Sequence, residues 1–318
     1  MEMRIIRAGQ LTTVQDLGRC GLRAAGVPLS GAMDPFALRI ANALVGNSEL
    51  AAALEFTLVG PEIEFTAEAR VALTGVECDG FAAWKPVVVP AGARVNLSRC
   101  VRGCHGYLAI AGGVEVPLVL RSRSTYLRGG FGGWQGRALR DGDVLPIGAA
   151  AAIEGTALAG VTGWRIDPRI LPAYSAKATV RTLPGAQGEE FGGALFEREF
   201  TVAPQSDRMG LRLLGPKLER SNTADLLSMA AAPGTIQVPP DGQPLALMAD
   251  AQTIGGYPQV AHVISVDLPV LAQLRPGDTV RFAPVTLAEA HRLAQAREHA
   301  VAMLREGLAE KLGAHPQP

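Results

Sequence analysis

The chain has 318 residues, of which 48% are hydrophobic, and its 30 Lys and Arg side chains balance its 30 Asp and Glu side chains. This length predicts one large domain or two of ordinary size, each able to bury a core. Zero net charge excludes a strong attraction to nucleic acid or to an anionic membrane, and the chain lacks the run of about 18 apolar residues that a membrane span needs.

The first well-marked element is a helix that begins after Asp34. Asp is a favoured N-cap, and Pro35 takes the first helical position, where a backbone N–H is not needed. Gly46 marks its end. One face carries the apolar side chains Phe36, Ile40 and Leu44. We therefore expect a helix over about residues 35–45.

Short strands dominate the rest of the chain. Glycine (37) and proline (22) are spread throughout and separate many short segments. Apolar and polar residues alternate, as on a half-buried strand, in residues 62–66, 93–97, 178–181, 199–202 and 279–282. Because strands do not alternate with long helices, a doubly wound parallel sheet is excluded and a mainly β fold is predicted.

A second helix is predicted from Thr286 to about Leu312. It opens with a capping box that ends at Glu289, and an apolar stripe lies opposite a charged face. The simplest interpretation is a C-terminal amphipathic helix docked on the β structure. A helix that binds a partner is the alternative.

A weak internal repeat indicates two β domains. A Gly-Asp turn leads into a strand in residues 139–144 and again in residues 274–280. The Ala- and Gly-rich stretch between them is the expected linker. We predict two β domains with a cleft between them and a C-terminal helix and tail, over residues 1–155, 156–285 and 286–318.

Standard catalytic and metal-binding motifs are absent from the sequence. It contains no P-loop, no G-x-S-x-G elbow and no H-E-x-x-H helix. Cys100, Cys104 and His105 lack a second cluster with zinc spacing, so we expect no metal site and ordinary reduced thiols. His105 and His262 lie in strand-like segments and are expected to be satisfied core residues.

Two loops in the first half of the chain are richer in polar residues and glycine than a scaffold needs. Ser30 and Gly31 come just before the first helix, where backbone N–H groups and the helix dipole favour an anion; a simple capped turn is the alternative. Residues 121–133 combine hydroxyl groups with three arginines, among them Arg123, whose guanidinium suits a carboxylate or a carbonate. A solvated strand edge explains the arginines equally well but leaves the glycines of residues 129–133 unexplained.

Two further loops lie in the second half. Asp207 and Arg208 are adjacent, and either form a local ion pair or hold a substrate carboxylate.

The last loop begins where an apolar strand ends, at Asp250. A carboxylate there can accept a proton, and Gln252 and Thr253 can donate to a carbonyl oxygen. The paired glycines that follow let a ligand approach the backbone. A polar β-turn is the alternative.

Several strings along the chain resemble the allophanate hydrolase subunit 2 family, which is also a biotin-dependent carboxyltransferase family. They match in the family's order over about residues 4–284, at residues 13–19, 30–34, 41–47, 107–113, 122–133, 206–210, 237–239 and 250–258. The resemblance implies two domains with cyclophilin-like β-barrels, which agrees with the mainly β prediction.

The family includes the carboxyltransferase half of urea carboxylase, an antagonist of a sporulation-kinase inhibitor, and the C component of bacterial 5-oxoprolinase. A free-standing chain without a biotin-acceptor Met-Lys motif is most similar to the 5-oxoprolinase type. That resemblance implies an ATP-hydrolysing complex that opens 5-oxoproline to glutamate. The partners would be the A and B components of that complex, of which the B component is of the allophanate hydrolase subunit 1 type.

The resemblance further implies that a partner binds most of the ATP, and that biotin takes part only through a partner. A small molecule is the expected substrate, with no nucleic acid and no membrane as partners, and the expected location is the cytoplasm. Two alternatives remain: a regulatory protein that antagonises a kinase inhibitor, and a biotin-dependent carboxyltransferase for urea or another amide.

Together, the loops and the resemblance imply a set of site residues. Asp250 is the expected general base, Arg123 and Arg208 hold the substrate carboxylate, and Gln252 stabilises the oxyanion. Substrate binding is expected at Ser30, Gly31, Ser124, Thr125, Tyr126, Asp207, Gln237, Thr253, Gly255, Gly256 and Tyr257.

Five positions depart from the family pattern, one of them Arg121, which stands where a glycine is common. Ala251 and Gln259 stand where family members often carry Arg and Lys, and Met229 and Ala230 replace Glu and Gly. The changed charge at these positions bears on the substrate rather than on the fold.

Overall fold

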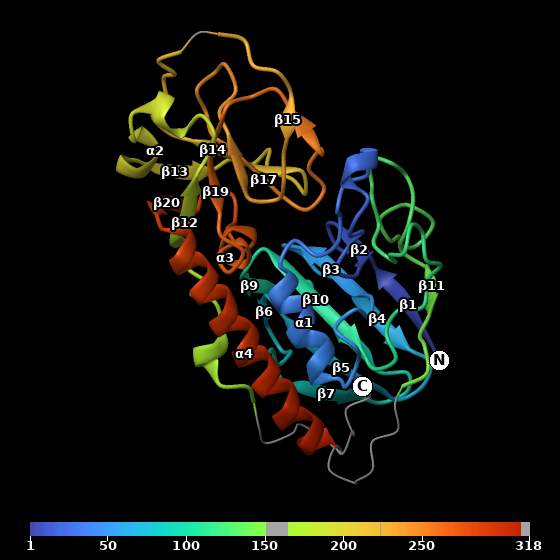
Figure 1. The fold of residues 1–318 in the computed structure, drawn as a ribbon. Coiled ribbons are helices and arrows are strands. Elements are labelled where there is room, and N and C mark those ends of the chain that lie inside the picture. Colours follow the sequence, from blue (N-terminus) through green and yellow to red (C-terminus); the bar gives the residue numbers. More distant parts are fainter. Residues whose placement is uncertain (151–164, 223, 313–318) are drawn as a thin grey trace. The chain divides into compact units, whose positions relative to one another are not determined.

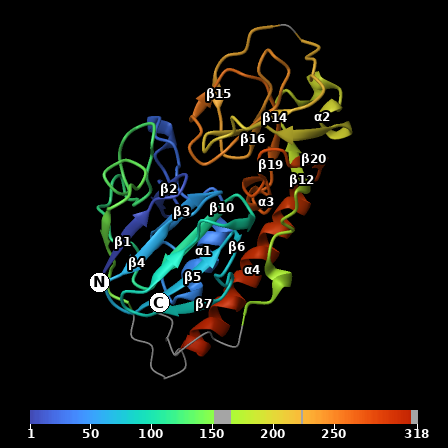
Figure 2. The ribbon, with the colours of Figure 1, turned by 180° about the vertical axis from the view of Figure 1, so that it is seen from behind.

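The computed structural model describes residues 1–150, 165–222 and 224–312 (Figures 1 and 2). It is mainly β, as predicted, with the long C-terminal helix in place. The predicted domain boundary between residues 155 and 156 lies outside the described residues.

The chain divides into two compact units, each made of separate pieces. Unit 1 comprises Met1–Gly18, Asp34–Ile170 and Glu298–Pro318, and unit 2 comprises Arg19–Met33 and Leu171–Arg297. No pattern in the sequence indicates that residues 19–33 join the second half of the chain.

Unit 1 contains a four-stranded sheet in the order β11-β1-β4-β8 and a five-stranded sheet in the order β2-β3-β10-β5-β7. Strand neighbours in both sheets are antiparallel. The strands are β1 (Glu2–Arg7), β2 (Thr12–Gln15), β3 (Ala53–Thr57), β4 (Glu62–Phe65), β5 (Ala69–Thr74), β7 (Pro86–Val89), β8 (Arg94–Asn96), β10 (His105–Ile110) and β11 (Val144–Pro146).

The core of unit 1 lies between these two sheets. Ile63 and Phe65 of the four-stranded sheet share one hydrophobic cluster with Phe56 and Leu108 of the five-stranded sheet. In β4 the buried positions alternate with glutamates on the outer face, as the sequence predicts. Each such side chain contributes about 1.5–3 kcal/mol on burial, so the alternation determines which face turns inward.

Helix α1 (Pro35–Leu44) covers the other face of the five-stranded sheet at β5 and β10, as both ribbon views show. The side chain of Asp34 caps the helix by accepting a hydrogen bond from the backbone N of Ala37 at 2.9 Å. Ile40 and Leu44 are fully buried. The helix and its cap are confirmed, and the five-stranded sheet is covered on both faces in this region.

Unit 2 is built on a closed barrel in the strand order β12-β19-β16-β17-β14-β13-β20, with a two-stranded ribbon β15-β18. Its core includes Val180, Phe200, Leu213, Ile236 and Val280. The strands are β12 (Lys177–Pro184), β13 (Glu199–Val202), β14 (Gly210–Leu214), β15 (Met229–Ala230), β16 (Thr235–Gln237), β17 (Leu245–Leu247), β18 (Ile254–Gly255), β19 (Gln259–Val263) and β20 (Thr279–Pro284). Between these strands lie the short helical segments η3 (Gly188–Phe191), α2 (Ala194–Glu197) and α3 (Leu268–Ala272). Unit 2 also contains η1 (Arg23–Ala25), and unit 1 contains η2 (Pro168–Ile170).

The internal repeat predicted from the sequence is a repeated turn. In one copy, Arg140 N donates to Asp143 Oδ2 at 2.8 Å and Asp143 N donates to Arg140 O at 3.1 Å. In the other, Arg275 N donates to Asp278 Oδ2 at 2.8 Å and Asp278 N donates to Arg275 O at 3.0 Å. The turns lead into β11 and β20, and β20 closes the barrel of unit 2.

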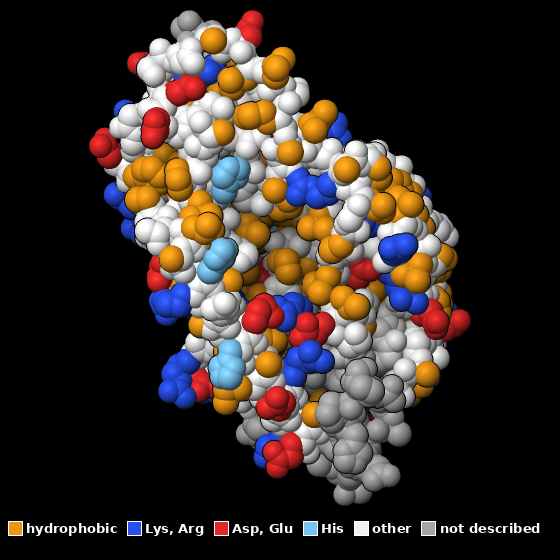
Figure 3. Space-filling model, viewed as in Figure 1, with side chains coloured by type: hydrophobic (Ala, Val, Ile, Leu, Met, Phe, Trp, Pro, Cys, Tyr) orange, Lys and Arg blue, Asp and Glu red, His pale blue; other side chains and the backbone are white. Residues whose placement is uncertain are grey.

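Helix α4 (Leu287–Leu312) is confirmed, and Glu289 N donates to Thr286 Oγ1 at 3.2 Å at its start. Residues up to Arg297 belong to unit 2 and the remainder to unit 1. Within unit 1, Arg39 of α1 donates two hydrogen bonds to Glu298, both at 2.7 Å, and two to Glu49, at 3.0 and 3.5 Å. Charged side chains of both signs are interspersed with hydrophobic ones on the face seen in Figure 3, as the balanced composition predicts.

The expectation of four reduced thiols is wrong for two cysteines. β6 (Glu77–Cys78) and β9 (Cys100–Arg102) form a short antiparallel ribbon, and Cys78 lies opposite Cys100. A disulfide joins the two. Cys104 is the near neighbour of Cys100 in the sequence, but strand pairing brings together cysteines that are 22 residues apart.

Candidate active site

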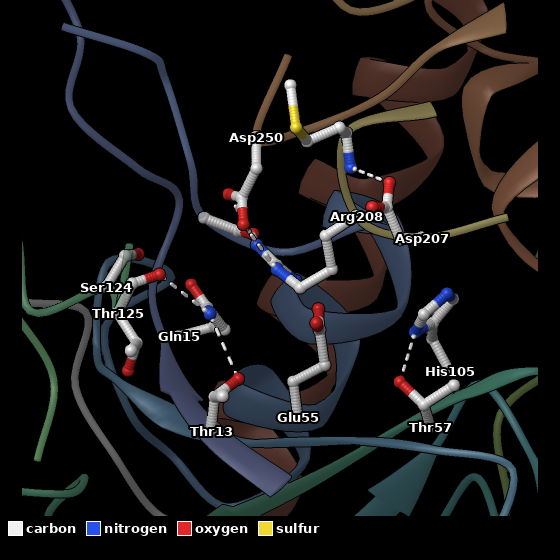
Figure 4. Close-up of polar contacts among 12 residues, drawn as sticks. Thr13, Gln15, Glu55, Thr57, His105, Ser124, Thr125, Asp207, Arg208 and Asp250 are labelled. Atoms are coloured by element: carbon white, nitrogen blue, oxygen red, sulfur yellow. Dashed lines mark hydrogen bonds and ion pairs between the residues drawn. The ribbon is translucent and has the colours of Figure 1, made fainter. Parts of the chain in front are cut away.

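A buried ion pair joins Arg208 and Asp250 in unit 2. Arg208 Nε donates to Asp250 Oδ2 at 2.9 Å and Arg208 Nη2 donates to Oδ1 at 3.0 Å, so guanidinium and carboxylate meet edge to edge (Figure 4). Each side chain is only 5% exposed. Removing one partner from such a pair leaves an uncompensated buried charge. The two predicted catalytic residues, Arg208 and Asp250, are therefore directly bonded to each other.

Two neighbouring strands bring this pair together. β14 and β17 are antiparallel, with Gly210 opposite Leu247. Their pairing continues beyond the strand ends, because Asp250 N donates to Arg208 O at 2.9 Å. Asp207 stabilises the adjacent turn, since its Oδ1 accepts from the backbone N of Met209 at 2.8 Å and of Gly210 at 3.2 Å (Figure 4).

The predicted loop at Ser30 and Gly31 reaches the same pair. Arg208 Nη2 donates to the carbonyl oxygen of Gly31 at 2.6 Å, and Ser30 N donates to the carbonyl oxygen of Ala249 at 2.9 Å. Ser30 has a left-handed backbone, with φ of 53°. Its Oγ is buried and has no hydrogen-bond partner among the described residues. Four predicted residues therefore gather here: Ser30, Gly31, Arg208 and Asp250.

The loop after Asp250 forms the β15-β18 ribbon. Gln252 and Thr253 are half-buried, and the carbonyl oxygen of Thr253 accepts from Ala231 N at 2.9 Å. Gly255 packs closely against Gln237, because a Cβ at Gly255 would lie 2.8 Å from Gln237 Nε2. A side chain larger than hydrogen would therefore displace Gln237.

Gln237 is a second polar group without a partner. It is fully buried, and neither Oε1 nor Nε2 has a hydrogen-bond partner within the described part of the chain. An unsatisfied buried amide costs about 1–3 kcal/mol for each group. An unsatisfied buried polar group in a native fold needs an explanation, and a hydrogen bond to a ligand is one.

A cleft of about 740 Å³ opens beside this segment of unit 2. Gly256 and Tyr257 line it together with Pro239. Its charged lining residues are of both signs: Lys217, Arg220, Glu219, Asp225 and Asp241. Two predicted substrate-binding residues therefore face a cavity.

Four of the five positions that depart from the family pattern gather around the β15-β18 ribbon. Met229 pairs with Gly255 across the ribbon. Gln259 Nε2 donates to the carbonyl oxygen of Ala230 at 2.8 Å, and Ala251 is buried. These four departures therefore change one local environment, whereas the fifth, Arg121, belongs to unit 1.

The Arg123 segment belongs to unit 1 and is organised by Asp16, which the sequence analysis did not single out. Asp16 Oδ1 accepts from Ser122 Oγ at 2.6 Å and from Ser124 Oγ at 2.5 Å, and Oδ2 accepts from Arg123 N at 2.5 Å. Arg123 Nε donates to the carbonyl oxygen of Val116 at 2.9 Å. One carboxylate thus fixes the backbone that carries the predicted arginine.

The neighbouring predicted residues and glycines are explained by the same segment. Thr125 Oγ1 donates to the carbonyl oxygen of Val14 at 3.0 Å. The rings of Tyr126 and Phe131 meet edge to face with centroids 5.4 Å apart. A Cβ at Gly133 would lie 1.9 Å from Thr125 Oγ1, and the φ of Gly133 is 51°. This glycine is required by the close packing of the loop.

A further polar cluster in unit 1 was missed. Glu55 is 2% exposed in the middle of a β strand, and Tyr107 Oη donates to its Oε2 at 2.8 Å. Burial raises the pKa of Tyr107 well above its usual value, and the charges of Glu55 and Asp34 raise it further. The signal for this cluster in the sequence was a glutamate within the otherwise apolar residues 53–56.

His105 is a buried residue, as predicted, whereas His262 is only half-buried. His105 Nδ1 is 3.3 Å from Thr57 Oγ1, and His262 Nδ1 is 3.2 Å from Thr235 Oγ1. Burial lowers the pKa of His262. Across the described residues, no group of three or more His, Cys, Asp or Glu side chains is arranged to hold a metal ion. No helix in residues 1–150, 165–222 or 224–312 combines the length and hydropathy that crossing a membrane requires.

Residues 25–284 match the family described as carboxyltransferase domain, subdomain A and B. The chain belongs to this family. The match includes both Arg208 and Asp250 as well as the Ser30 loop. The resemblance read from the sequence is therefore confirmed.

Two relatives in the family match along almost their whole length. The chain is 44% identical over 298 residues to the 5-oxoprolinase C subunit of Escherichia coli (strain K12), covering 91% of this chain and 93% of the relative. It is 38% identical over 309 residues to the 5-oxoprolinase C subunit of Haemophilus influenzae, covering 94% and 96%. These names support a role for the chain within an enzyme complex.

The fold is also that of a solved carboxylase structure. Kluyveromyces lactis urea carboxylase superposes with a TM-score of 0.87 at 29% identity, covering 100% of this chain and 30% of that protein. The chain thus corresponds to one portion of a much larger protein.

Proposed function

We propose that this carboxyltransferase-family chain is one component of an ATP-dependent 5-oxoprolinase complex that opens 5-oxoproline to glutamate. The observation that carries the proposal is the 44% identity to the C subunit of a 5-oxoprolinase over nearly the full length of both chains. The partners would be the A and B components of the complex, the latter of the allophanate hydrolase subunit 1 type.

In the proposed reaction, water adds to the lactam carbonyl and the ring C–N bond breaks, leaving a carboxylate and an amine. ATP bound by a partner would activate the lactam by phosphorylating its carbonyl oxygen with release of ADP. After the ring opens, a second water would release the phosphoryl group as inorganic phosphate. Asp250 accepts the proton of the attacking water. A carboxylate has about four acceptor positions, and Arg208 occupies two of them, so acceptor capacity remains for the substrate.

The other groups are assigned to positioning and to charge stabilisation. Arg208 orients the carboxylate of Asp250 through its two parallel hydrogen bonds. The Gln252 amide, the Thr253 hydroxyl and the backbone N–H groups near Gly255 donate to the developing oxyanion. For Arg123, the family resemblance alone supports a role in binding a carboxylate. Ser30 Oγ and Gln237 supply buried polar atoms that need partners.

The test is reconstitution with the partner proteins and measurement of ATP-dependent glutamate release from 5-oxoproline. Asp250→Asn keeps the shape of the side chain and is expected to lower turnover by at least about 100-fold, as loss of a general base does. Glu306→Gln, an exposed change on α4, is the control and should leave turnover unchanged. A wild-type complex without turnover would refute the function, and an unimpaired Asp250→Asn complex would remove only Asp250 from its role.

The similarity to urea carboxylase favours one second candidate, a biotin-dependent carboxyltransferase that acts on urea or another amide. Biotin would then be carried by a partner. Amide carboxylation that avidin abolishes, in a complex without 5-oxoproline turnover, would support this candidate over the first.

A further inference from the structure

The disulfide between Cys78 and Cys100 encloses residues 79–99, which contribute a strand to each sheet of unit 1. Strand β7 pairs with β5 and is the last strand in the order of the five-stranded sheet. Strand β8 pairs with β4 and is the last strand in the order of the four-stranded sheet. Because a cross-link reduces the number of conformations available to an open chain, it disfavours opening of the loop that it closes. The mobility of residues 79–99 therefore depends on the two sulfur atoms.

The two cysteines lie in the β6-β9 ribbon, which is separate from both sheets. The neighbouring pair in this ribbon, Glu77 and Arg102, is joined by an ion pair of 3.7 Å between exposed side chains. Cys100 is partly exposed, whereas Cys78 is buried. Both features favour attack by a small thiol at Cys100 Sγ while the two sheets stay folded.

The fold also accommodates the reduced thiols. The carbonyl oxygen of Leu97 lies 3.2 Å from Cys100 Sγ and 3.8 Å from Cys78 Sγ. This oxygen accepts one hydrogen bond, from Gly60 N at 3.1 Å, and a carbonyl oxygen has two lone pairs, so it can accept a second bond from a thiol. Breaking the disulfide therefore leaves an acceptor within reach of the thiols that form.

The enclosed segment also contacts helix α1. The rings of Trp84 and Phe36 have centroids 6.4 Å apart. Trp84 has a left-handed backbone, with φ of 60°, a conformation that residues with side chains keep only where the surrounding structure holds them. The backbone at Trp84 is therefore expected to gain freedom when residues 79–99 are released from the cross-link.

We propose that Cys78 and Cys100 form a reversible thiol–disulfide switch that controls the mobility of residues 79–99. In the reducing step, the thiolate of a small thiol such as glutathione attacks Cys100 Sγ, the S–S bond breaks, and Cys78 leaves as a thiolate and takes up a proton. A second glutathione attacks the glutathione sulfur of this mixed disulfide, which releases the Cys100 thiol and forms glutathione disulfide. Two electrons and two protons thus pass to the protein, and the reverse steps restore its disulfide. The inference goes beyond the proposed function and does not depend on it, since it concerns unit 1 and not turnover.

The test compares the oxidised and the reduced full-length chain under native conditions. The chain is equilibrated with oxidised glutathione or with an excess of reduced glutathione, and alkylation followed by peptide mass spectrometry identifies the cysteines that are thiols. Hydrogen exchange of the same samples measures the mobility of the backbone. Cys100→Ser removes the disulfide without a reductant. Cys20 is exposed and takes no part in the disulfide, so Cys20→Ser is the matched control.

We expect reduced glutathione to convert Cys78 and Cys100 to thiols in the folded chain, and oxidised glutathione to restore the disulfide. In the reduced chain, the amides of residues 79–99 should exchange at least about tenfold faster, while those of the barrel strands in unit 2 keep their rates. Cys100→Ser should resemble the reduced chain in both buffers. Cys20→Ser should respond as the wild type does.

Three results would overturn the switch. The first is a disulfide that glutathione reduces only after urea has unfolded the chain, since such a bond is a permanent cross-link. The second is an unchanged exchange rate over residues 79–99 on reduction. The third is that Cys78 and Cys100 remain thiols in oxidised glutathione, or that Cys104 takes the place of either one. The comparison of the two buffers with the wild type decides between these outcomes even if Cys100→Ser does not fold.

Discussion

Arg208 and Asp250 lie 42 residues apart in the sequence and meet through two parallel hydrogen bonds in the interior of unit 2. Arg208→Met would leave the Asp250 carboxylate buried without its cation, so we expect a loss of about 3–5 kcal/mol in the free energy of unfolding. The measurement is urea denaturation of the isolated chain. The double variant Arg208→Met with Asp250→Leu should recover much of the loss, because no charge is then stranded.

The exposed pair Arg281 and Glu199 provides the comparison, with side chains 58% and 42% exposed. Arg281→Met should lower the free energy of unfolding by less than about 1 kcal/mol. Equal losses at the two sites would contradict the burial argument.

The second half of α4 is held to unit 1 by Arg39. Its pKa is raised, chiefly by the hydrogen bonds to Glu298, so the guanidinium stays charged. Glu298→Gln should cost about 1 kcal/mol or less, because Glu298 is 60% exposed. Hydrogen exchange of the amides after Glu298 should become faster. Glu306→Gln, an exposed change in the same helix, should alter neither quantity.

The Arg137–Asp143 pair predicts an acid-dependent contribution to stability. Hydrogen bonds from Arg137 lower the pKa of Asp143 from 3.8 to about 2. A carboxyl group with a depressed pKa in the folded state stabilises the fold above its unfolded pKa, and this contribution is lost as the pH falls from about 4 to about 2.

Asp143→Asn should therefore be about 1 kcal/mol less stable than the wild type at pH 7, with a difference that disappears near pH 2. Urea unfolding across this pH range is the measurement. Glu68→Gln is an exposed change in the same unit, and its difference in stability from the wild type should not shrink as the pH falls. A gap that stays constant with pH would exclude the ion pair as its cause.

Gly133 combines a left-handed φ with close packing against Thr125. Gly133→Ala is expected to destabilise the chain by more than about 2 kcal/mol, since strain and a collision add. Gly130 has a φ of 64° but nothing within 4 Å of an added Cβ, so Gly130→Ala isolates the strain and should cost about 1 kcal/mol. Thermal unfolding of both variants measures the difference. Similar losses of stability would show that the structure relaxes to remove the collision with Thr125.

Local signals in the sequence predicted the secondary structure well. The cap at Asp34, the capping box at Thr286 and the alternation in β4, β13 and β20 all depend on neighbouring residues, and each appears where expected. The repeated Gly-Asp turn was visible for the same reason. The pairing of Cys78 with Cys100 depends on which strands become neighbours, and no local pattern shows that.

The candidate site was predictable only in part. Asp250 and Arg208 stood out because polar residues follow apolar strands, but their direct pairing required the register of β14 and β17. Asp16 and Glu55 sit in or beside strands and resemble ordinary strand polar residues. Their importance comes from hydrogen bonds to residues 50 or more positions away, such as Ser124 and Tyr107.

Neither unit can be cut from the gene as one continuous piece. Residues 19–33 belong to unit 2 although they are synthesised more than a hundred residues before the rest of it, and the residues from Glu298 onward belong to unit 1 although they are synthesised after unit 2. In the nascent chain, residues 19–33 can take their final place only after the later part of unit 2 has been synthesised. A truncated expression product that starts at residue 171 would lack residues 19–33 of its own unit. A version of the protein that contains only unit 2 would therefore have to be a circular permutant or a complex of two fragments.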